Sequence, residues 1–243
     1  MKTLIAWVVL LLAPSAFAST GGVRIDALNL ERYDVASLQR GAQGFVNYCM
    51  GCHSASYMRF NRLTAIGLTE EQIKDNLIFT DVKVGDTMRI AMSLTDGKSW
   101  FGAAPPDLSV IARSRGTDWL YTYLRTFYRD PSRPTGWNNL AFASVGMPHV
   151  LYELQGVQTL KVEKSKDAHG HEVESRTLVL DKPGRLTPLE YDRFAADLTN
   201  FLAYAAEPAR YDRVRIGVYT LLFLGVLLVF AWLLKREFWK DVH

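Results

Sequence analysis

Residues 49–53 read Cys49-Met50-Gly51-Cys52-His53, and this stretch determines how the rest of the chain is interpreted. Two cysteines separated by two residues and followed at once by histidine form the pattern needed for covalent haem attachment. Each thiol adds to a haem vinyl group, and the imidazole of His53 then lies beneath the iron as proximal ligand. The chain has two cysteines, and both are in this motif. The motif predicts one covalently attached haem c, with one-electron transfer at iron and no catalytic acid, base or nucleophile.

A C-x-x-C pair also occurs in redox-active dithiols and in zinc sites. A dithiol would be expected within a thioredoxin-like βαβ pattern, which the sequence lacks. A zinc site would need further cysteine or histidine ligands in pairs. The immediate histidine, the export signal described next and the absence of other cysteines favour haem attachment.

The first 18 residues have the features of a secretory signal peptide. Lys2 supplies the positive charge, residues 4–12 form the apolar core, and Ala16-Phe17-Ala18 is a small-residue cleavage site. Cleavage is expected after Ala18, and an uncleaved anchor helix is the alternative. Either way the following residues are exported, and a Gram-negative periplasm is the expected compartment. This agrees with the haem motif, because c-type haem is attached outside the cytoplasm.

Near the other end, residues 216–234 form an apolar run of 19 residues without a charge. At about 1.5 Å per residue in a helix, the run matches the ~30 Å of bilayer hydrocarbon. Tyr219 and Trp232 lie near its ends, where aromatic belts occur in membrane proteins. All faces of the run are apolar, which disfavours the alternative of a buried core helix. The run predicts one transmembrane anchor in a lipid bilayer.

The signal peptide orients this anchor. Basic residues flank the run on both sides, so the positive-inside rule alone does not decide the orientation. Export of the body followed by a stop-transfer helix places the C-terminus in the cytoplasm of a bacterial inner membrane. The expected order is a signal peptide over 1–18, a periplasmic haem domain over 19–212, the anchor over 213–235 and a cytoplasmic tail over 236–243.

The composition fits a globular protein and argues against a nucleic-acid partner. Hydrophobic residues make up 49% of the 243 residues, which is enough for one core. The formal net charge is +3, and no cluster of lysine and arginine with interleaved aromatic residues occurs.

Two helices are expected to cross beside the haem motif. Asp34 can cap the first helix, which runs into Cys49. Gly41 on its face permits close approach of another helix, and Phe45 packs one turn later. The second helix opens at Thr187-Pro188-Leu189-Glu190, with an N-cap threonine, a proline at the first position and a capping-box glutamate. Its apolar stripe consists of Tyr191, Phe194, Leu198, Phe201, Leu202 and Ala205.

Shorter elements are expected between these two helices. A capping box at residues 69–72 opens one helix, and Thr117 can cap another that ends before Pro131. Residues 129–150 are rich in proline and glycine and are interpreted as a loop. Residues 157–180 alternate with a period near two around a polar tip, which predicts a β-hairpin insertion.

Two histidines, His169 and His171, lie at the tip of the expected hairpin. A pair of this spacing can bind metal. An exposed loop pair without carboxylate or cysteine partners is more often solvated, so a metal site is not expected here.

A haem that only carries electrons needs a second protein ligand to close the iron site. Methionine raises the reduction potential, because a soft thioether favours Fe(II). Met147 lies between Gly146 and Pro148, 94 residues after His53, in a segment able to fold across the distal face. Spacing leaves other ligands open, namely Met88, Met92, His149, His169 and His171; Met50 and Met58 are too near the motif to reach that face.

Four ordered motifs give the chain a specific resemblance. Residues 40–54, RGAQGFVNYCMGCHS, resemble the haem-bearing helix of class I cytochromes c. Residues 105–109, PPDLS, followed by ARSRG, and residues 144–153, SVGMPHVLYE, resemble segments of the cytochrome c1 family, the haem subunits of cytochrome bc1 complexes (ubiquinol–cytochrome c reductases). Ala206-Glu207-Pro208 and the single anchor after it occur in the same order in that family. The similarity covers nearly the whole mature chain.

The resemblance implies a mainly α fold: a class I cytochrome c-like haem domain with loop and β-hairpin insertions, plus one C-terminal transmembrane helix. It implies Met147 as sixth ligand and Pro106 packed against the haem. It implies an arginine paired with a haem propionate, for which Arg115 is the best match and Arg113 the rival. Trp119 stands where the family has tyrosine. The disulfide of some bacterial members is absent, so packing must hold the loops.

The resemblance also implies the function. The protein would accept one electron from the Rieske iron–sulfur protein and pass it to a soluble periplasmic cytochrome c, beside cytochrome b in a dimeric complex. Its enzyme status would be that of an electron-transfer subunit of quinol–cytochrome c reductase. An anchored monohaem cytochrome outside the bc1 complex, feeding a terminal oxidase, is the alternative. A haem sensor or peroxidase would require that Met147 leave the iron open.

Overall fold

The computed structural model describes residues 23–29, 34–166 and 172–241. The expected signal peptide, and with it the cleavage site, lies outside these residues, as do His169 and His171. In chain order the elements are α2 (Val35–Gly44), η1 (Phe45–Cys49), β1 (Ala55–Arg59), η2 (Phe60–Ile66), α3 (Glu70–Leu77), β2 (Thr87–Met88), α4 (Leu94–Phe101), α5 (Ile111–Arg115), α6 (Thr117–Arg125), β3 (Phe127–Arg129), β4 (Trp137–Asn139), α7 (Tyr152–Gln155), β5 (Gly156–Lys166), β6 (Glu172–Pro183), α8 (Pro188–Ala206) and α9 (Arg210–Phe238).

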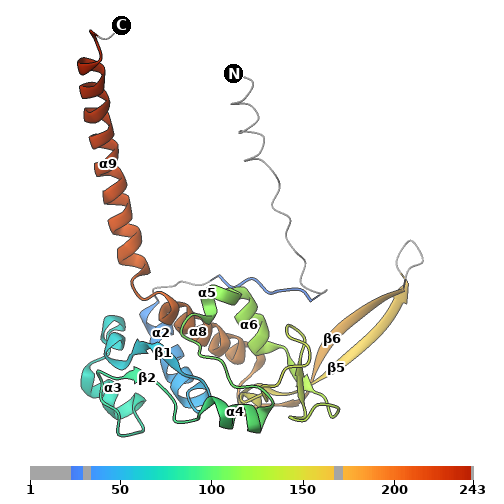
Figure 1. Cartoon of the computed structure of the whole chain (residues 1–243). Coiled ribbons are helices and arrows are strands. Elements are labelled where there is room, and N and C mark those ends of the chain that lie inside the picture. Colours follow the sequence, from blue (N-terminus) through green and yellow to red (C-terminus); the bar gives the residue numbers. More distant parts are fainter. Residues whose placement is uncertain (1–22, 30–33, 167–171, 242–243) are drawn as a thin grey trace.

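Helix α2 crosses helix α8 at very short range, as Figure 1 shows near the centre of the soluble body. The contact is possible because Gly41 has no side chain: a Cβ there would lie 2.1 Å from the backbone oxygen of Asp197 and 2.7 Å from the Cβ of Phe201. One turn further along α2, the Phe45 ring lies 5.5 Å from the Phe201 ring between centroids. The crossing confirms the expected pairing of these two helices.

The chain leaves α2 through one π-helical turn that ends on the first cysteine. Asp34 caps α2 by accepting a hydrogen bond from the Ser37 backbone N–H at 3.1 Å. The five-residue turn η1 follows without a break, and the Met50 N–H donates to the Phe45 oxygen at 2.9 Å. Such π turns are frequent at functional sites. The His53 N–H then donates to the Cys49 oxygen, which folds the motif back on the helix end.

Helix α8 is the central element of the core. It begins with the expected capping box, in which Thr187 and Glu190 exchange hydrogen bonds. Its buried face includes Tyr191, Ala195, Leu198, Phe201, Leu202 and Ala205, and it packs against α2, α5, α6 and α7.

The other elements differ in places from the sequence expectation. Gly116, with φ of 87°, occupies the N-cap position of α6, and Thr117 is its first helical residue without a side-chain cap. Residues 129–150 are not all loop, because β3 and β4 pair as a short antiparallel hairpin. Phe127 lies in β3, outside the helix that was expected to carry it.

The predicted β-hairpin insertion is confirmed over its described strands. Strands β5 and β6 pair antiparallel along their length, and the hairpin projects from the body in Figure 1. Its base is held by Gln158, whose side-chain amide donates to the backbone oxygens of Arg125 and Phe127 at 2.9 Å each.

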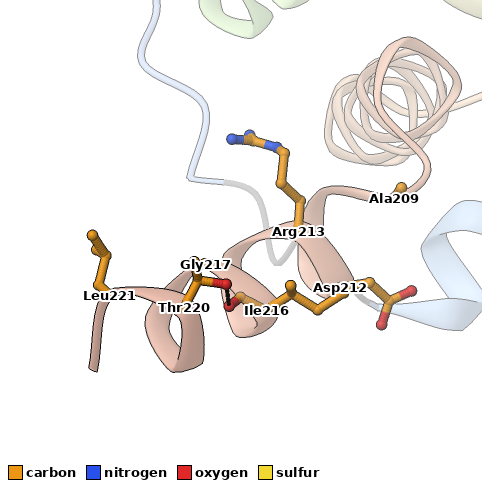
Figure 2. Close-up of a pocket in the computed structure, with 7 residues that line it drawn as sticks. All are labelled: Ala209, Asp212, Arg213, Ile216, Gly217, Thr220 and Leu221. Atoms are coloured by element: carbon orange, nitrogen blue, oxygen red, sulfur yellow. Dashed lines mark hydrogen bonds between the residues drawn. The ribbon is translucent and has the colours of Figure 1, made fainter. Parts of the chain in front are cut away.

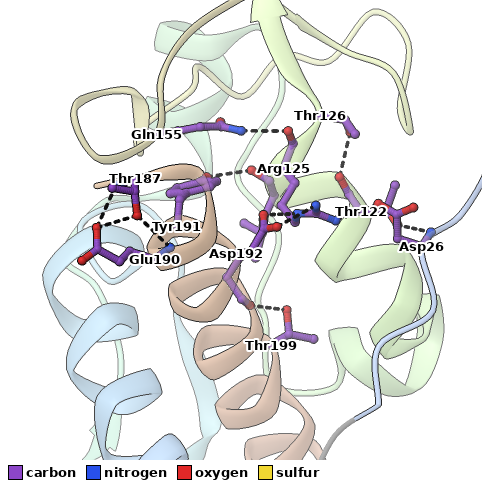
Figure 3. Close-up of polar contacts among 12 residues, drawn as sticks. Asp26, Thr122, Arg125, Thr126, Gln155, Thr187, Glu190, Tyr191, Asp192 and Thr199 are labelled. Atoms are coloured by element: carbon purple, nitrogen blue, oxygen red, sulfur yellow. Dashed lines mark hydrogen bonds and ion pairs between the residues drawn. The ribbon is translucent and has the colours of Figure 1, made fainter. Parts of the chain in front are cut away.

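Arg125 joins four segments that are distant in sequence (Figure 3). Its guanidinium pairs with Asp192 of α8 at 2.5 Å and with Asp26 of the N-terminal arm at 2.7 Å. Its backbone oxygen accepts hydrogen bonds from Gln155 and Gln158 at the hairpin base. The Arg125 side chain is 23% exposed, so loss of its carboxylate partners would leave a partly buried charge unpaired.

Helix α9 rises away from the soluble body (Figure 1). Among the described residues it is the one helix long and apolar enough to cross a membrane, over Asp212–Phe238. Its most apolar 18-residue window has a mean hydropathy of 2.4 and is not buried within the chain. It fits the single C-terminal anchor. The junction before it is short, since α8 ends at Ala206 and α9 begins at Arg210.

Replacing Gly41 with alanine is expected to lower the free energy of unfolding by about 1–3 kcal/mol, because the new methyl group collides with α8 backbone. Denaturant unfolding of the detergent-solubilised protein, followed by far-ultraviolet circular dichroism, measures the change. The matched control is Gly85→Ala, because a Cβ at Gly85 meets nothing within 4 Å. Equal stability of the two variants would contradict the close-crossing interpretation.

Candidate haem site

One cavity of about 420 Å³ brings the sequence-predicted site residues together. Both cysteines, His53 and Met147 line it, although they come from segments 94 residues apart. Its volume falls within the roughly 300–1,000 Å³ typical of cofactor pockets. The other lining residues are mostly apolar and come from α8, α6, the segment before α5 and the loop around Met147, and they include Leu198, Leu202, Leu120, Leu124, Pro105, Val145 and Pro148.

His53 is held in the orientation that a metal ligand needs. Its Nδ1 lies 2.7 Å from the backbone oxygen of Pro106. A carbonyl oxygen accepts only, so Nδ1 carries the proton and the lone pair is on Nε2. Burial lowers the pKa of His53, while the hydrogen bond to Pro106 and the charge of Asp107 oppose that effect. The result is a neutral imidazole with its second nitrogen free, which is the form that binds iron.

The segment Pro105–Ser109 runs beside the haem motif and fixes His53 in place. The Leu108 N–H donates to the Ser54 oxygen at 2.8 Å, and the Ser56 N–H donates to the Asp107 carboxylate at 2.9 Å. The Asp107 carboxylate also accepts from both Ser109 donors. Partial burial would raise the pKa of Asp107, but these hydrogen bonds lower it overall, so the carboxylate stays charged.

The two cysteines are free thiols and do not form a disulfide. Burial raises the pKa of Cys49 to about 12, with a further contribution from Cys52. Reactive redox dithiols have depressed thiol pKa values, because the thiolate is the nucleophile. The environment of Cys49 therefore argues against a dithiol and agrees with a thiol that receives a covalent cofactor.

Met147 lies on the opposite loop, and Tyr123 contacts its sulfur. The Tyr123 hydroxyl donates a hydrogen bond to Sδ of Met147 at 3.4 Å. Burial raises the pKa of Tyr123, so the hydroxyl keeps its proton and acts as a donor. The other candidate methionines lie elsewhere: Met88 is fully buried in β2, and Met92 packs near Gly97. Neither lines the cavity.

Arg115 lies over the Trp119 ring, and both residues line the cavity. The Arg115 guanidinium carbon lies 5.0 Å from the Trp119 ring centroid and 5.8 Å from that of Phe142. Trp119 in turn stacks on Tyr123 at 5.0 Å between centroids. The rival Arg113 does not line the cavity and instead lies 4.0 Å from Glu207.

The residues present fit a haem. The donor set is one neutral imidazole and one thioether, beside two thiols at the attachment spacing, and the walls are apolar. Among the described residues no group of three or more His, Cys, Asp or Glu side chains forms an alternative metal site. The roles of Tyr123 and Phe142 were not expected from the sequence, although Trp119 and Tyr123 stand four residues apart on one helix face.

A second cavity, of about 610 Å³, lies along the start of α9 (Figure 2). Arg213, Asp212, Thr220 and small or aliphatic residues line it. The Thr220 hydroxyl donates to the Ile216 oxygen of its own helix. None of the haem-motif residues reaches this cavity, which faces the outside of the anchor helix.

Comparison with known proteins gives a consistent result. A family model described as the Cytochrome C1 family matches residues 27–158 and 184–242. The chain is 51% identical to cytochrome c1 of Allochromatium vinosum over the full length of both proteins. It is 51% identical to the ammonia monooxygenase gamma subunit of Nitrosomonas europaea over 96% of each chain. It is 29% identical to cytochrome c1 of Rhodospirillum rubrum over 98% of this chain and 95% of that one.

The family match covers the haem-motif region of the chain but leaves out most of the β5–β6 hairpin. The matched stretches omit residues 159–183, which make up most of the β5–β6 hairpin. The haem motif, the Pro105–Ser109 segment and the Met147 loop all lie within the matched part. The alignment with the Allochromatium protein covers 100% of both chains, so the hairpin lies within that similarity.

Proposed function

The chain belongs to the cytochrome c1 family, and from this premise we propose that it binds one haem c covalently through Cys49 and Cys52, with His53 and Met147 as axial ligands. We further propose that it receives single electrons from the Rieske iron–sulfur protein and delivers them to a soluble periplasmic cytochrome c. The observation that carries this proposal is the shared cavity, which the two thiols, His53 and Met147 all line. At the coarser level, the chain is a membrane-anchored haem protein of electron transport in bc1-type complexes.

Each part of the site has a separate task. When bound, the haem supplies one-electron chemistry at iron. His53 would hold the iron through Nε2, and the Pro106 oxygen keeps its ring oriented for this. Met147 would supply the second protein ligand, which would keep small molecules off the iron and raise the reduction potential. Arg115 supplies a guanidinium for a propionate, and Trp119 supports it from beneath.

The surroundings of the site favour electron transfer over substrate chemistry. The cavity walls are mostly apolar, and the polar side chains among them include Arg115, which stays charged, and Tyr123, whose hydroxyl keeps its proton. The chain on its own therefore performs no substrate chemistry, and its enzyme status is that of an electron-transfer subunit of a reductase complex. Proton translocation would belong to the assembled complex.

The partners and location follow from the same proposal. Cytochrome b is the expected neighbour of α9 within a dimeric bc1 complex. The haem domain would lie in the periplasm and the C-terminus in the cytoplasm, because the predicted signal peptide exports the residues before the anchor. The apolar helix over Asp212–Phe238 is long enough to cross a membrane once, which supports this arrangement.

The complex itself tests the partner proposal. Detergent extraction and affinity purification of the tagged chain should yield cytochrome b and a Rieske protein in equal amounts with it, and quinol should reduce its haem through them. Isolation of a solitary haem protein that quinol and a Rieske protein do not reduce would reject the proposal in favour of a carrier that feeds an oxidase.

Replacing Met147 with alanine tests the sixth ligand. The ferric protein should lose the weak near-infrared absorption of His/Met haem, the ferrous protein should bind carbon monoxide, and the potential should fall by on the order of 100 mV or more. Optical spectra and redox titration measure these changes. Met92→Ala is the matched control, since Met92 is partly buried outside the cavity, and it should leave all three unchanged. An unaltered spectrum in Met147→Ala would rule out this ligand.

Replacing Tyr123 with phenylalanine should lower the potential by about 20–40 mV. The hydroxyl withdraws electron density from the Met147 sulfur and so favours Fe(II), and its hydrogen bond contributes roughly 0.5–1 kcal/mol. Redox titration measures the shift. The control is Tyr121→Phe on the same helix, which faces Arg125 and does not line the cavity. A raised or unchanged potential in Tyr123→Phe would show that the hydroxyl does not act on the ligand.

A further inference from the structure

His149 is a histidine with an unusual position, two residues after the proposed ligand Met147 and yet turned away from the haem cavity. It is 2% exposed and does not line the cavity. Its ring stacks on Phe127 with 4.8 Å between centroids and 5° between planes. The Trp137 ring meets it edge to face at 5.1 Å and 75°. Two aromatic rings therefore enclose it.

The imidazole in this enclosure has few polar partners. The Gln155 side chain is the polar group beside it. Among the described residues, neither Nε2 of His149 nor Oε1 of Gln155 has a hydrogen-bond partner. A buried polar atom without a partner costs free energy, so the packing around the ring must compensate for it. The ring is an imidazole that could act as an iron ligand if it left this enclosure, and it lies two residues along the chain from Met147.

A neutral imidazole is a better ligand for ferric iron than a thioether, and it stabilises the oxidised state. Residues 147 and 149 are two apart, so their Cα atoms are separated by at most about 7 Å. A local rearrangement of the loop would therefore exchange one ligand for the other. Such an exchange would produce a low-potential site unable to serve the same electron acceptor.

We propose that Phe127 and Trp137 are positioning residues that hold His149 in an aromatic cage and so keep Met147, rather than His149, on the iron. This proposal rests on the proposed function, because it requires Met147 to be the sixth ligand of the iron. Strands β3 and β4 supply its two walls, and their pairing of Arg129 with Trp137 fixes the second wall. Gln155 holds the far end of the loop by donating to the Arg125 oxygen at 2.8 Å.

The short hairpin is itself anchored to the helix that carries Tyr123. The Asn139 side chain donates to the Tyr123 backbone oxygen at 2.8 Å and accepts from the backbone N–H groups of Ala141 and Phe142. Asn139 is 1% exposed. The same elements therefore hold the Met147 sulfur near Tyr123 and the His149 ring beside Phe127 and Trp137. A change in the packing of these elements would affect both candidate ligands together.

The test uses the full-length, haem-loaded protein in its complex. In Phe127→Ala, the ferric near-infrared band of His/Met ligation should decrease, the iron should stay six-coordinate and low-spin by electron paramagnetic resonance, and the potential should fall. Adding His149→Gln to Phe127→Ala should abolish this low-potential form, because the competing ligand is gone. A low-potential, six-coordinate form that persists without His149 would overturn the proposal.

Two further outcomes also decide the matter. If Phe127→Ala keeps the band and the potential, no cage is needed. If it loses the band but binds carbon monoxide readily, with no dependence on His149, the ring only supports the loop and the proposal fails. Wild-type protein without the band would instead reject Met147 as ligand, which distinguishes failure of the proposed function from failure of the cage.

Controls separate the cage from general loss of stability. Phe127→Leu keeps most of the buried volume but removes the stacking ring, so it should show the same ligand exchange in a better-folded protein. Phe60→Leu is the matched control, because Phe60 is equally buried at 1% exposure and lies in η2, away from the loop. It should leave the band and the potential unchanged while costing similar stability.

Discussion

The hydrogen bond between His53 Nδ1 and the Pro106 oxygen is the interaction on which the candidate site depends. It selects the tautomer of His53 and leaves Nε2 for the cavity. The bond exists because the Pro105–Ser109 segment is fastened along the residues that follow the motif, through Leu108, Ser56 and Asp107. A proline has no backbone N–H, so its carbonyl oxygen is the polar group with which Pro106 can bond to the histidine, as an acceptor. The orientation of His53 is therefore set by backbone pairing as much as by the motif itself.

Much of this arrangement was predictable because it follows from local chemistry. The Asp34 and Thr187 caps and the apolar span each depend on residues a few positions apart, and each occurs as expected. The Gly41 crossing was expected from a local signal too, a glycine one turn before Phe45, although its partner helix is distant in sequence. Met147 was preferred as sixth ligand because it lies between Gly146 and Pro148 in a loop, and the resemblance strengthened this preference, which stays a prediction. Met88 is a buried residue of β2 that does not line the cavity.

The features that could not be predicted depend on contacts between distant segments. The β3 and β4 strands are three residues each, too short to show an alternating pattern. Asn138 donates to Asp130 across the turn between them, and the Asn139 side chain accepts from Thr126. The start of α6 was misassigned because Gly116, in a conformation that favours glycine, takes the cap position. The contact of Tyr123 with Met147 depends on how the loop around Met147 folds against α6, which sequence patterns do not show.

The junction between α8 and α9 has a consequence for how the molecule works in a membrane. Three residues separate the helices, and Glu207 among them accepts from Arg213 of the anchor while Arg113 lies nearby. A joint this short, with an ion pair across it, restricts how far the body can rotate relative to α9. If the chain acts as proposed, its haem domain stays near one height above the bilayer, and the electron-transfer partners must move to reach it.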